Sequence, residues 1–209
     1  MVSRWALLVV GAGVAAAPGS ARAEWFEHVG GGEALMVLPR LQADSATSFA
    51  STGFGGRVFY GFGVLHDIYA VARFSVWTHG GTVPGVTRSG DRGTFTGDLA
   101  FHGEAYKGEL GLKYKLISGF NLTPYVDVFG GWQWTTFRGQ DLRNAGGGSF
   151  GLTMPDTGRG AFTAGAGVSL EYRLFNLVLV SASGLYSRVF DDSYRGDLAM
   201  GLNGAISWF

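Results

Sequence analysis

The stretch from Arg159 to Phe175, RGAFTAGAGVSLEYRLF, alternates between two kinds of side chain. Its even positions are apolar or aromatic, and its odd positions up to Arg173 are small, hydroxylated or charged. Because the side chains of a β-strand point alternately to opposite faces, this period of two predicts one strand with an apolar and a polar face, and excludes a helix. A tilted strand crosses a bilayer with about 9–11 residues, so this one is long enough.

The first 23 residues have the pattern of a secretory signal peptide. A basic start, MVSR, precedes an apolar run from Trp5 to Ala17, and Ala21-Arg22-Ala23 is an A-x-A cleavage site. The alternative, a membrane-anchoring helix, needs a longer apolar run, and this one ends at Pro18-Gly19. We therefore expect residues 1–23 to be removed on export, residues 24–32 to form a periplasmic lead-in, and residues 33–209 to form one domain.

Charge and composition exclude several classes of protein. The chain has 16 basic and 16 acidic residues, which gives no indication of nucleic-acid binding. It has no cysteine, so no disulfide framework holds it in the oxidising compartment beyond the inner membrane. After residue 23 it has no apolar run long enough for a transmembrane helix. With 36 glycines and a period of two, it is either a soluble β-sandwich or barrel, or an outer-membrane barrel.

The same alternation recurs along the chain and predicts eight strands, of which the first is weakened by Pro39. The connections alternate between long or polar loops and brief turns, as in transmembrane β-barrels with short periplasmic turns, so we expect both chain ends in the periplasm. Residues 79–102 and 138–158 are the two long loops, although Thr94 to Phe101 could extend a strand beyond the membrane. The predicted strands are residues 34–43, 52–64, 69–78, 103–116, 123–137, 159–175, 177–190 and 196–209.

The aromatic residues of the apolar face fall into two groups by depth. Bilayer interfaces select such girdles around an aliphatic band, whereas a soluble core does not sort its aromatic residues in this way. The glycine-rich polar face suits the narrow lumen of eight strands. The predicted fold is therefore an all-β, eight-stranded antiparallel up-and-down transmembrane β-barrel. The girdle residues are Phe54, Tyr106, Trp132, Trp134, Phe162 and Tyr186 near the long loops, and Phe62, Tyr114, Tyr172 and Trp208 near the short turns.

The signal peptide, the loop asymmetry, the girdles and the terminal Phe209 together resemble the small outer-membrane barrels of the OmpA and OmpX type. The resemblance covers the whole mature chain. It implies a monomer in contact with outer-membrane lipids and lipopolysaccharide, whose last strand is recognised by the barrel-insertion machinery. The chain departs from the family pattern at its end, because the apolar set from Leu198 to Trp208 is out of phase with Phe209, and a β-bulge would restore the phase.

Charged residues on the polar face are predicted to lie in the lumen. Buried charges are tolerated when they are paired, so the set predicts an ion-pair network that plugs the barrel. The alternative is a conduit that prefers anions, but eight strands leave little room for one. The predicted lumen residues are Arg40, Arg57, Arg73, Lys107, Glu109, Lys113, Asp127, Glu171 and Arg173.

Two other kinds of site were considered. His79 and His102 flank one long loop and could meet near Asp98 or Glu104 as metal ligands, but their spacing matches no metal motif, so we expect no metal and no cofactor. A lipid-modifying enzyme needs a nucleophilic serine with a base near the membrane rim. Ser187 is the candidate nucleophile, although any histidine partner would have to reach it across the barrel.

These observations predict a non-enzymatic integral outer-membrane protein with a plugged lumen. Its role would be structural in the envelope or would involve surface interaction through the loops. The alternatives are a narrow porin-like conduit and, second, a lipid-modifying enzyme.

Overall fold

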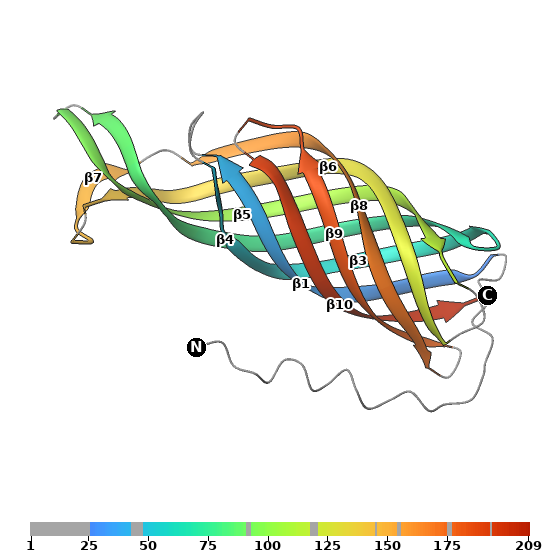
Figure 1. Ribbon diagram of the computed structural model, residues 1–209. Coiled ribbons are helices and arrows are strands. Elements are labelled where there is room, and N and C mark those ends of the chain that lie inside the picture. The colour runs from blue at the N-terminus through green and yellow to red at the C-terminus, as the bar shows by residue number, and fades with distance from the viewer. Residues whose placement is uncertain are drawn as a thin grey trace.

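The computed structural model describes residues 26–42, 48–90, 93–117, 121–144, 146–153, 156–174, 177–192 and 194–209 (Figure 1). The predicted signal peptide, residues 1–23, lies outside these ranges. The regular structure within them is β-strand, and they contain no helix long and apolar enough to span a bilayer.

Eight of the ten strands in the described ranges close into a ring. Each ring strand is antiparallel to its neighbours along the chain, and pairing of the first strand with the last completes the barrel. This confirms the predicted eight-stranded up-and-down barrel. The strands of the ring are β1 (His28–Gln42), β3 (Thr52–Leu65), β4 (Ile68–Gly90), β5 (Gly93–Lys115), β6 (Leu122–Arg143), β8 (Thr157–Leu174), β9 (Val178–Val189) and β10 (Tyr194–Trp208). The short strands β2 (Ser48–Ala50) and β7 (Ser149–Thr153) pair with β1 and β6.

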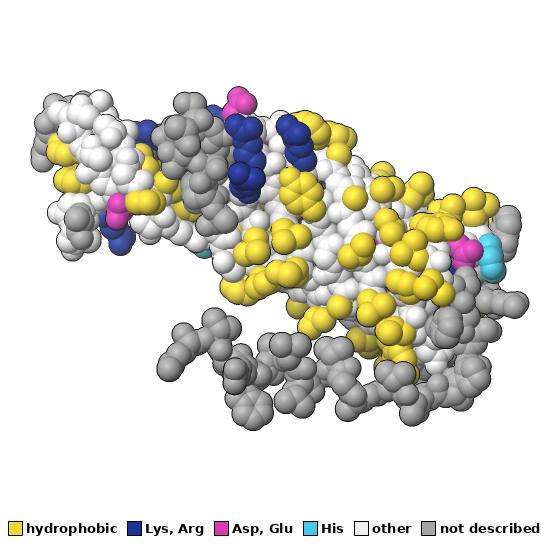
Figure 2. Space-filling view, in the orientation of Figure 1, with side chains coloured by type: hydrophobic (Ala, Val, Ile, Leu, Met, Phe, Trp, Pro, Cys, Tyr) yellow, Lys and Arg dark blue, Asp and Glu magenta, His cyan; other side chains and the backbone are white. Residues whose placement is uncertain are grey.

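The side chains alternate between the two faces of the barrel wall as predicted. On β8, Phe162, Val168 and Leu170 are exposed, whereas Thr163 and the other odd positions between 161 and 171 turn inward. Large apolar side chains are likewise exposed on the outside of β3, β4, β5, β6, β9 and β10, and form an outward apolar belt. The outward Met36 and Leu38 of β1 are half-buried. Figure 2 shows the hydrophobic side chains as patches spread over the face in view. An exposed apolar surface of this extent suits hydrocarbon rather than water, which separates this barrel from a soluble one.

The structure places most of the girdle aromatics on this outer face. Phe62 and Tyr172 are half-buried, and the other eight are exposed. At the short-turn end, where β1 meets β10, the His28 ring stacks on Trp208 with the ring centres 5.7 Å apart and lies 5.0 Å from Phe62. These contacts hold the two ends of the ring together.

The prediction was wrong about the first strand's start. β1 begins at His28, so residues 28–32 are strand rather than a periplasmic lead-in, and His28 pairs with both Trp208 and Phe62. Glycines at 30, 31 and 32 suggested a linker, but in this barrel they pair in register with two neighbouring strands.

The two predicted long loops are largely strand. Residues 79–102 continue β4 and β5, whose pairing runs to Gly90 and Gly93, and residues 138–158 include the end of β6, all of β7 and the start of β8. β3 pairs with β4 only as far as Gly80, so the β4–β5 hairpin extends beyond the ring (Figure 1). The suggested extension through Thr94 to Phe101 is confirmed.

The last strand keeps its alternation between the two faces up to Trp208. The pairing of β10 with β1 runs without a shift from Leu198 to Trp208, so the bulge that would restore Phe209 to the apolar set is absent from these described residues. The irregularity of β10 lies at its other end, between Tyr194 and Gly196. Phe209 follows the strand and is exposed, as is Trp208.

Candidate functional site

Paired charges fill the middle of the lumen. Arg57 on β3 and Glu33 on β1 are direct cross-strand neighbours, and the Arg57 Nη1 atom lies 3.0 Å from Glu33 Oε2. Both side chains are only 3% exposed. Arg57 also donates from Nε to Ser75 Oγ at 2.9 Å, and the hydroxyl of Ser183 donates to Glu33. This pair therefore has both of the features that make a buried charge tolerable, an opposite charge and additional hydrogen bonds.

A second cluster surrounds Lys107 nearer the long-hairpin end. Its ammonium nitrogen lies 3.1 Å from both carboxylate oxygens of Asp197, 2.7 Å from Ser187 Oγ and 3.3 Å from Glu109 Oε1. Ser187 donates to Asp197 at 2.7 Å. The contact between Lys107 and Glu109 falls short of hydrogen-bond geometry, so neither Glu109 carboxylate oxygen has a hydrogen-bond partner among the described residues.

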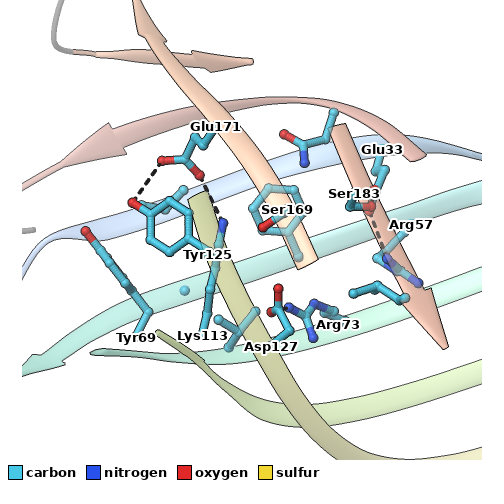
Figure 3. Close-up of a pocket in the computed structure, with 16 residues that line it drawn as sticks. Glu33, Arg57, Tyr69, Arg73, Lys113, Tyr125, Asp127, Ser169, Glu171 and Ser183 are labelled. Atoms are coloured by element: carbon cyan, nitrogen blue, oxygen red, sulfur yellow. Dashed lines mark hydrogen bonds and ion pairs between the residues drawn. The ribbon is translucent and has the colours of Figure 1, made fainter. Parts of the chain in front are cut away.

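Further pairs continue toward the short-turn end (Figure 3). Arg73 pairs with Asp127, and Lys113 Nζ lies 3.0 Å from Glu171. Nearest the short-turn end, Arg173 pairs with Glu27. Tyr69 and Tyr125 donate hydrogen bonds to Glu27 and Glu171 respectively.

The structure thus brings together eight of the nine predicted lumen charges. Arg40 was assigned wrongly, because it is exposed on the outer face of β1 while Leu35, Val37 and Leu41 point inward. Sequence reasoning missed three acidic partners, Glu27, Glu33 and Asp197. Extending the period of two upstream of Ala34 would have placed Glu27 and Glu33 on the same face as Leu35.

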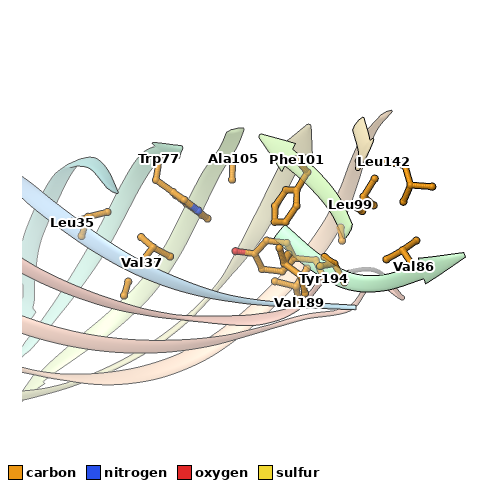
Figure 4. Packing of buried hydrophobic residues seen from close by; sticks show 14 residues of the cluster. Leu35, Val37, Trp77, Val86, Leu99, Phe101, Ala105, Leu142, Val189 and Tyr194 are labelled. Carbon is orange, nitrogen blue, oxygen red and sulfur yellow. The ribbon is translucent and has the colours of Figure 1, made fainter. Parts of the chain in front are cut away.

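An apolar cluster closes the lumen above the ion pairs (Figure 4). Trp77 belongs to this cluster, is 2% exposed, and its ring lies 5.4 Å from the Lys107 ammonium. The cluster takes buried side chains from seven of the eight ring strands, including the part of the β4–β5 hairpin beyond the ring. They include Leu35, Val37, Val86, Leu99, Phe101, Leu142, Val189 and Tyr194.

The free space left in the lumen is small. A cavity of about 40 Å³ lies among the lower ion pairs, lined by Glu33, Arg57, Ser169 and neighbouring residues. One water needs roughly 10–15 Å³ measured in this way, so the cavity has room for about three waters. Ser169 Oγ has no hydrogen-bond partner among the described residues and is a suitable site for one of these waters.

His79 and His102, the candidate metal ligands, do not lie on the same side of the barrel wall. His79 pairs with Gly103 and His102 with Gly80, so the two are close along the hairpin, but His79 is buried and His102 is exposed. No group of three acidic, histidine or cysteine side chains in the described part of the chain is arranged as a metal site. The outward apolar run of β4 ends at Val76, which places His79 beyond the membrane-spanning part, and burial, with a smaller effect of His102, lowers its pKa to about 4.

Ser187 is also placed differently from the enzyme hypothesis. Its side chain is on the lumen face, 1% exposed, and is held by Lys107 and Asp197. Tyr186, its neighbour, faces outward. A lipid substrate on the outer surface would therefore be on the opposite side of the barrel wall from this hydroxyl.

The part of the structure beyond the ring is a sheet formed by residues 81–90 of β4, 93–101 of β5, 138–143 of β6 and β7, which we call the projecting sheet. Val83, Val86 and Leu99 supply its buried face, and Phe95 packs against Phe150 with the ring centres 5.2 Å apart. On β6, Asp141 accepts a hydrogen bond from Ser149 and pairs with Arg143, and these contacts lower the pKa of Asp141.

These features define a small transmembrane β-barrel: a closed ring, an outward apolar belt, aromatic girdles and a charged interior.

No protein-family model matches the sequence, and no curated protein matches it either. Several solved structures match this fold. Neisserial surface protein A aligns with a TM-score of 0.56 at 12% identity, over 87% of this chain and 95% of that one. The attachment invasion locus protein Ail of Yersinia pestis aligns with a TM-score of 0.51 at 14% identity, over 88% of this chain and 100% of that one. The outer-membrane protein OprG of Pseudomonas aeruginosa aligns with a TM-score of 0.53 at 12% identity, over 88% of this chain and 97% of that one. The chain therefore has the fold of the OmpA- and OmpX-like class of bacterial outer-membrane barrels.

Proposed function

We propose that this protein is an integral outer-membrane barrel with a closed lumen, which presents the projecting sheet outside the cell. Its work is surface interaction or envelope structure rather than transport or catalysis. The observation that carries the proposal is the filling of the lumen, with paired charges in the middle and the Trp77 cluster above them. The cavity among the ion pairs, about 40 Å³, has room for only about three waters.

The unequal ends of the barrel support the proposed orientation. The turn at His66-Asp67 is tight, whereas the opposite end extends into the projecting sheet, and outer-membrane barrels have their short turns in the periplasm. Both ends of the described chain, Phe26 and Phe209, lie at the short-turn end, since β1 pairs with β10 from His28 to Trp208. The names of two similar barrels, a surface protein and an attachment protein, agree with a role outside the cell.

Absence of a catalytic centre is part of the proposal. It is supported by the position of Ser187, whose hydroxyl is enclosed with Lys107 inside the wall. A lipid-mass assay on membranes with and without the protein tests it, because a mass change that disappears in Ser187→Ala would restore the enzyme hypothesis.

The closed lumen is tested by planar-bilayer conductance of refolded residues 24–209. We expect no current steps from protein whose insertion is shown by heat-modifiable migration on a gel. Stable current steps whose selectivity changes in Arg57→Glu or Arg73→Glu would instead make the protein a narrow conduit.

The orientation is tested by cysteine labelling, which is clean because the chain has no cysteine. Thr87→Cys lies in the projecting sheet and His66→Cys in a short turn, and both side chains are exposed. In intact cells, a membrane-impermeant maleimide should label the first variant and leave the second unlabelled. The reverse result would mean that the projecting sheet faces the periplasm.

A further inference from the structure

His79 lies at the boundary between the ring and the projecting sheet. It pairs with Gly53 of β3, and the pairing of β3 with β4 ends one residue later, at Gly80. The His79 side chain points inward and is 2% exposed. Its ring lies over Gly103, its partner on β5, where a Cβ would be 2.5 Å from His79 Nε2. The glycine therefore leaves the room that a buried imidazole needs here.

Three aromatic rings from three other strands enclose the imidazole. The ring centres of Phe137, Phe101 and Tyr194 lie 5.8, 6.2 and 6.4 Å from that of His79, with the ring planes 64–89° apart. Phe101 and Tyr194 belong to the apolar cluster that closes the lumen, and Phe137 packs against it (Figure 4). The imidazole thus joins β4 to β5, β6 and β10 at the mouth of the barrel.

Neither imidazole nitrogen has a hydrogen-bond partner among the described residues. The charged groups on the strands packed against the ring either turn outward or are bound to one another, and Tyr194 is neutral. In the described part of the chain His79 forms no ion pair with a carboxylate, since Asp197 holds Lys107 and Glu104 lies 3.7 Å from Arg138. An imidazolium, which has two N–H donors, would therefore be buried here without a partner. The titratable and charged groups concerned are His102, Glu104 and Lys107 of β5, Arg138 of β6, Tyr194, Arg195 and Asp197 of β10, and Arg57 of β3.

The proton affinity of His79 depends on whether the ring stays enclosed. The residue lies beyond the membrane-spanning part, and burial, with a smaller effect of His102, lowers its pKa to about 4. In water the pKa of an imidazole is about 6.5. Below that pH, protonation favours any conformation that brings the ring into water, whereas the neutral ring favours the enclosed one.

The strands bend just beyond His79. Gly85 of β4 lies in a register shift against β5 and has a φ of 71°. Gly139 of β6 lies in another register shift against β5 and has a φ of 57°. β-Bulges of this kind bend a sheet, and β3 does not pair with β4 beyond the ring, so the projecting sheet can pivot here with its own pairing intact.

We propose that His79 is an acid-sensitive latch between the projecting sheet and the mouth of the barrel. At neutral pH the uncharged imidazole packs among the three rings and holds the base of the sheet against β10. In acid the imidazolium leaves this site for water, the sheet pivots at the two bulges, and buried side chains such as Leu99 become accessible. The latch goes beyond the proposed function, because it gives the surface that the protein presents a second conformation.

The test measures how fast a single introduced cysteine reacts in refolded residues 24–209 in lipid vesicles, since the chain has no cysteine of its own. Leu99→Cys replaces a side chain that is 7% exposed in the cluster at the mouth, and Leu179→Cys one that is 1% exposed in the lower lumen. The probe is 4,4′-dithiodipyridine, which reacts with thiols in acid as well as at neutral pH. Each rate is divided by that of the exposed Thr87→Cys at the same pH.

From pH 7 to pH 5 we expect the relative rate at Leu99→Cys to rise about twentyfold. This is the ratio given by a pKa of about 6.5 in the open form and about 4 in the closed one. In the His79→Phe background, where the ring cannot be protonated, the rate should change less than about twofold. The matched control is His102→Gln, which removes an outward-facing histidine and should keep most of the rise.

An unchanged rate at Leu99→Cys in the wild-type background would overturn the latch, and so would an equal rise in His79→Phe or the loss of the rise in His102→Gln. A parallel rise at Leu179→Cys would also refute it, since acid would then be unfolding the whole barrel. Only variants that keep heat-modifiable migration are scored, and His79→Leu takes the place of His79→Phe if the larger ring prevents folding.

Discussion

Removing one member of the Arg57–Glu33 pair tests whether the lumen is closed to bulk water. In Arg57→Met the Glu33 carboxylate keeps the hydroxyl of Ser183 but loses its counter-charge, in a site where the side chain is 3% exposed. Breaking a buried pair in this way costs about 3–5 kcal/mol, most of it from the unpaired charge. The same substitution in the exposed pair, Arg138→Met, removes an Arg138–Glu104 contact of 3.7 Å and should cost less than about 1 kcal/mol.

The double variant Arg57→Met/Glu33→Leu separates the charge effect from packing. With neither charge left, the lumen no longer contains an uncompensated carboxylate, so we expect the loss to be smaller than in Arg57→Met alone, with a coupling energy of about 2–3 kcal/mol. The assay is reversible urea unfolding of residues 24–209 in lipid vesicles, followed by the fluorescence of their five tryptophans. A loss below about 1 kcal/mol in Arg57→Met, equal to that of Arg138→Met, would mean that bulk water solvates Glu33 and would refute a closed lumen.

Three further changes test other parts of the structure. Ala166→Arg places a charge on the exposed outer face of β8 and should cost about 2–4 kcal/mol, against about 0–1 for Thr78→Arg beyond the apolar run of β4, again by urea unfolding in vesicles. Equal costs would move the membrane boundary. Gly131→Ala should destabilise the barrel by about 1–3 kcal/mol because its Cβ would collide with the Gly108 carbonyl oxygen, whereas Gly108→Ala, whose Cβ would meet nothing within 4 Å, should be nearly neutral. Comparable losses would show that the β5–β6 spacing adjusts. Because burial holds the pKa of His79 near 4, below about 6.5 in the unfolded chain, its contribution to stability is complete above pH 6.5 and is lost as the pH falls toward 4. Between pH 7 and pH 5 the wild type should therefore lose about 2 kcal/mol more than His79→Phe, and an equal loss in both would place His79 in water.

Several elements were predictable because they depend on local periodicity. Alternation along residues 159–175 places Phe162 and Val168 on one face and Thr163 and Glu171 on the other in any strand, and eight such runs with unequal connections define the barrel. Strand ends were less predictable. Residues 79–102 are rich in glycine and threonine, as a solvated loop is, and only the partner strand shows that Val83, Val86 and Leu99 share a buried face.

The sequence by itself determined the fold class and, on every strand but the first, which face turns outward, because alternation sets which side chains share a face and the aromatic girdles indicate the face that meets lipid. Only the tertiary structure decided which charges meet. Arg57 finds Glu33 and Lys107 finds Asp197 through the register of neighbouring strands and the closure of β1 on β10, which bring together residues far apart in the chain. The same register turns Arg40 outward, opposite Gly196 of β10. Pairing across a closed ring depends on how all the strands align, and no single stretch of sequence contains that information.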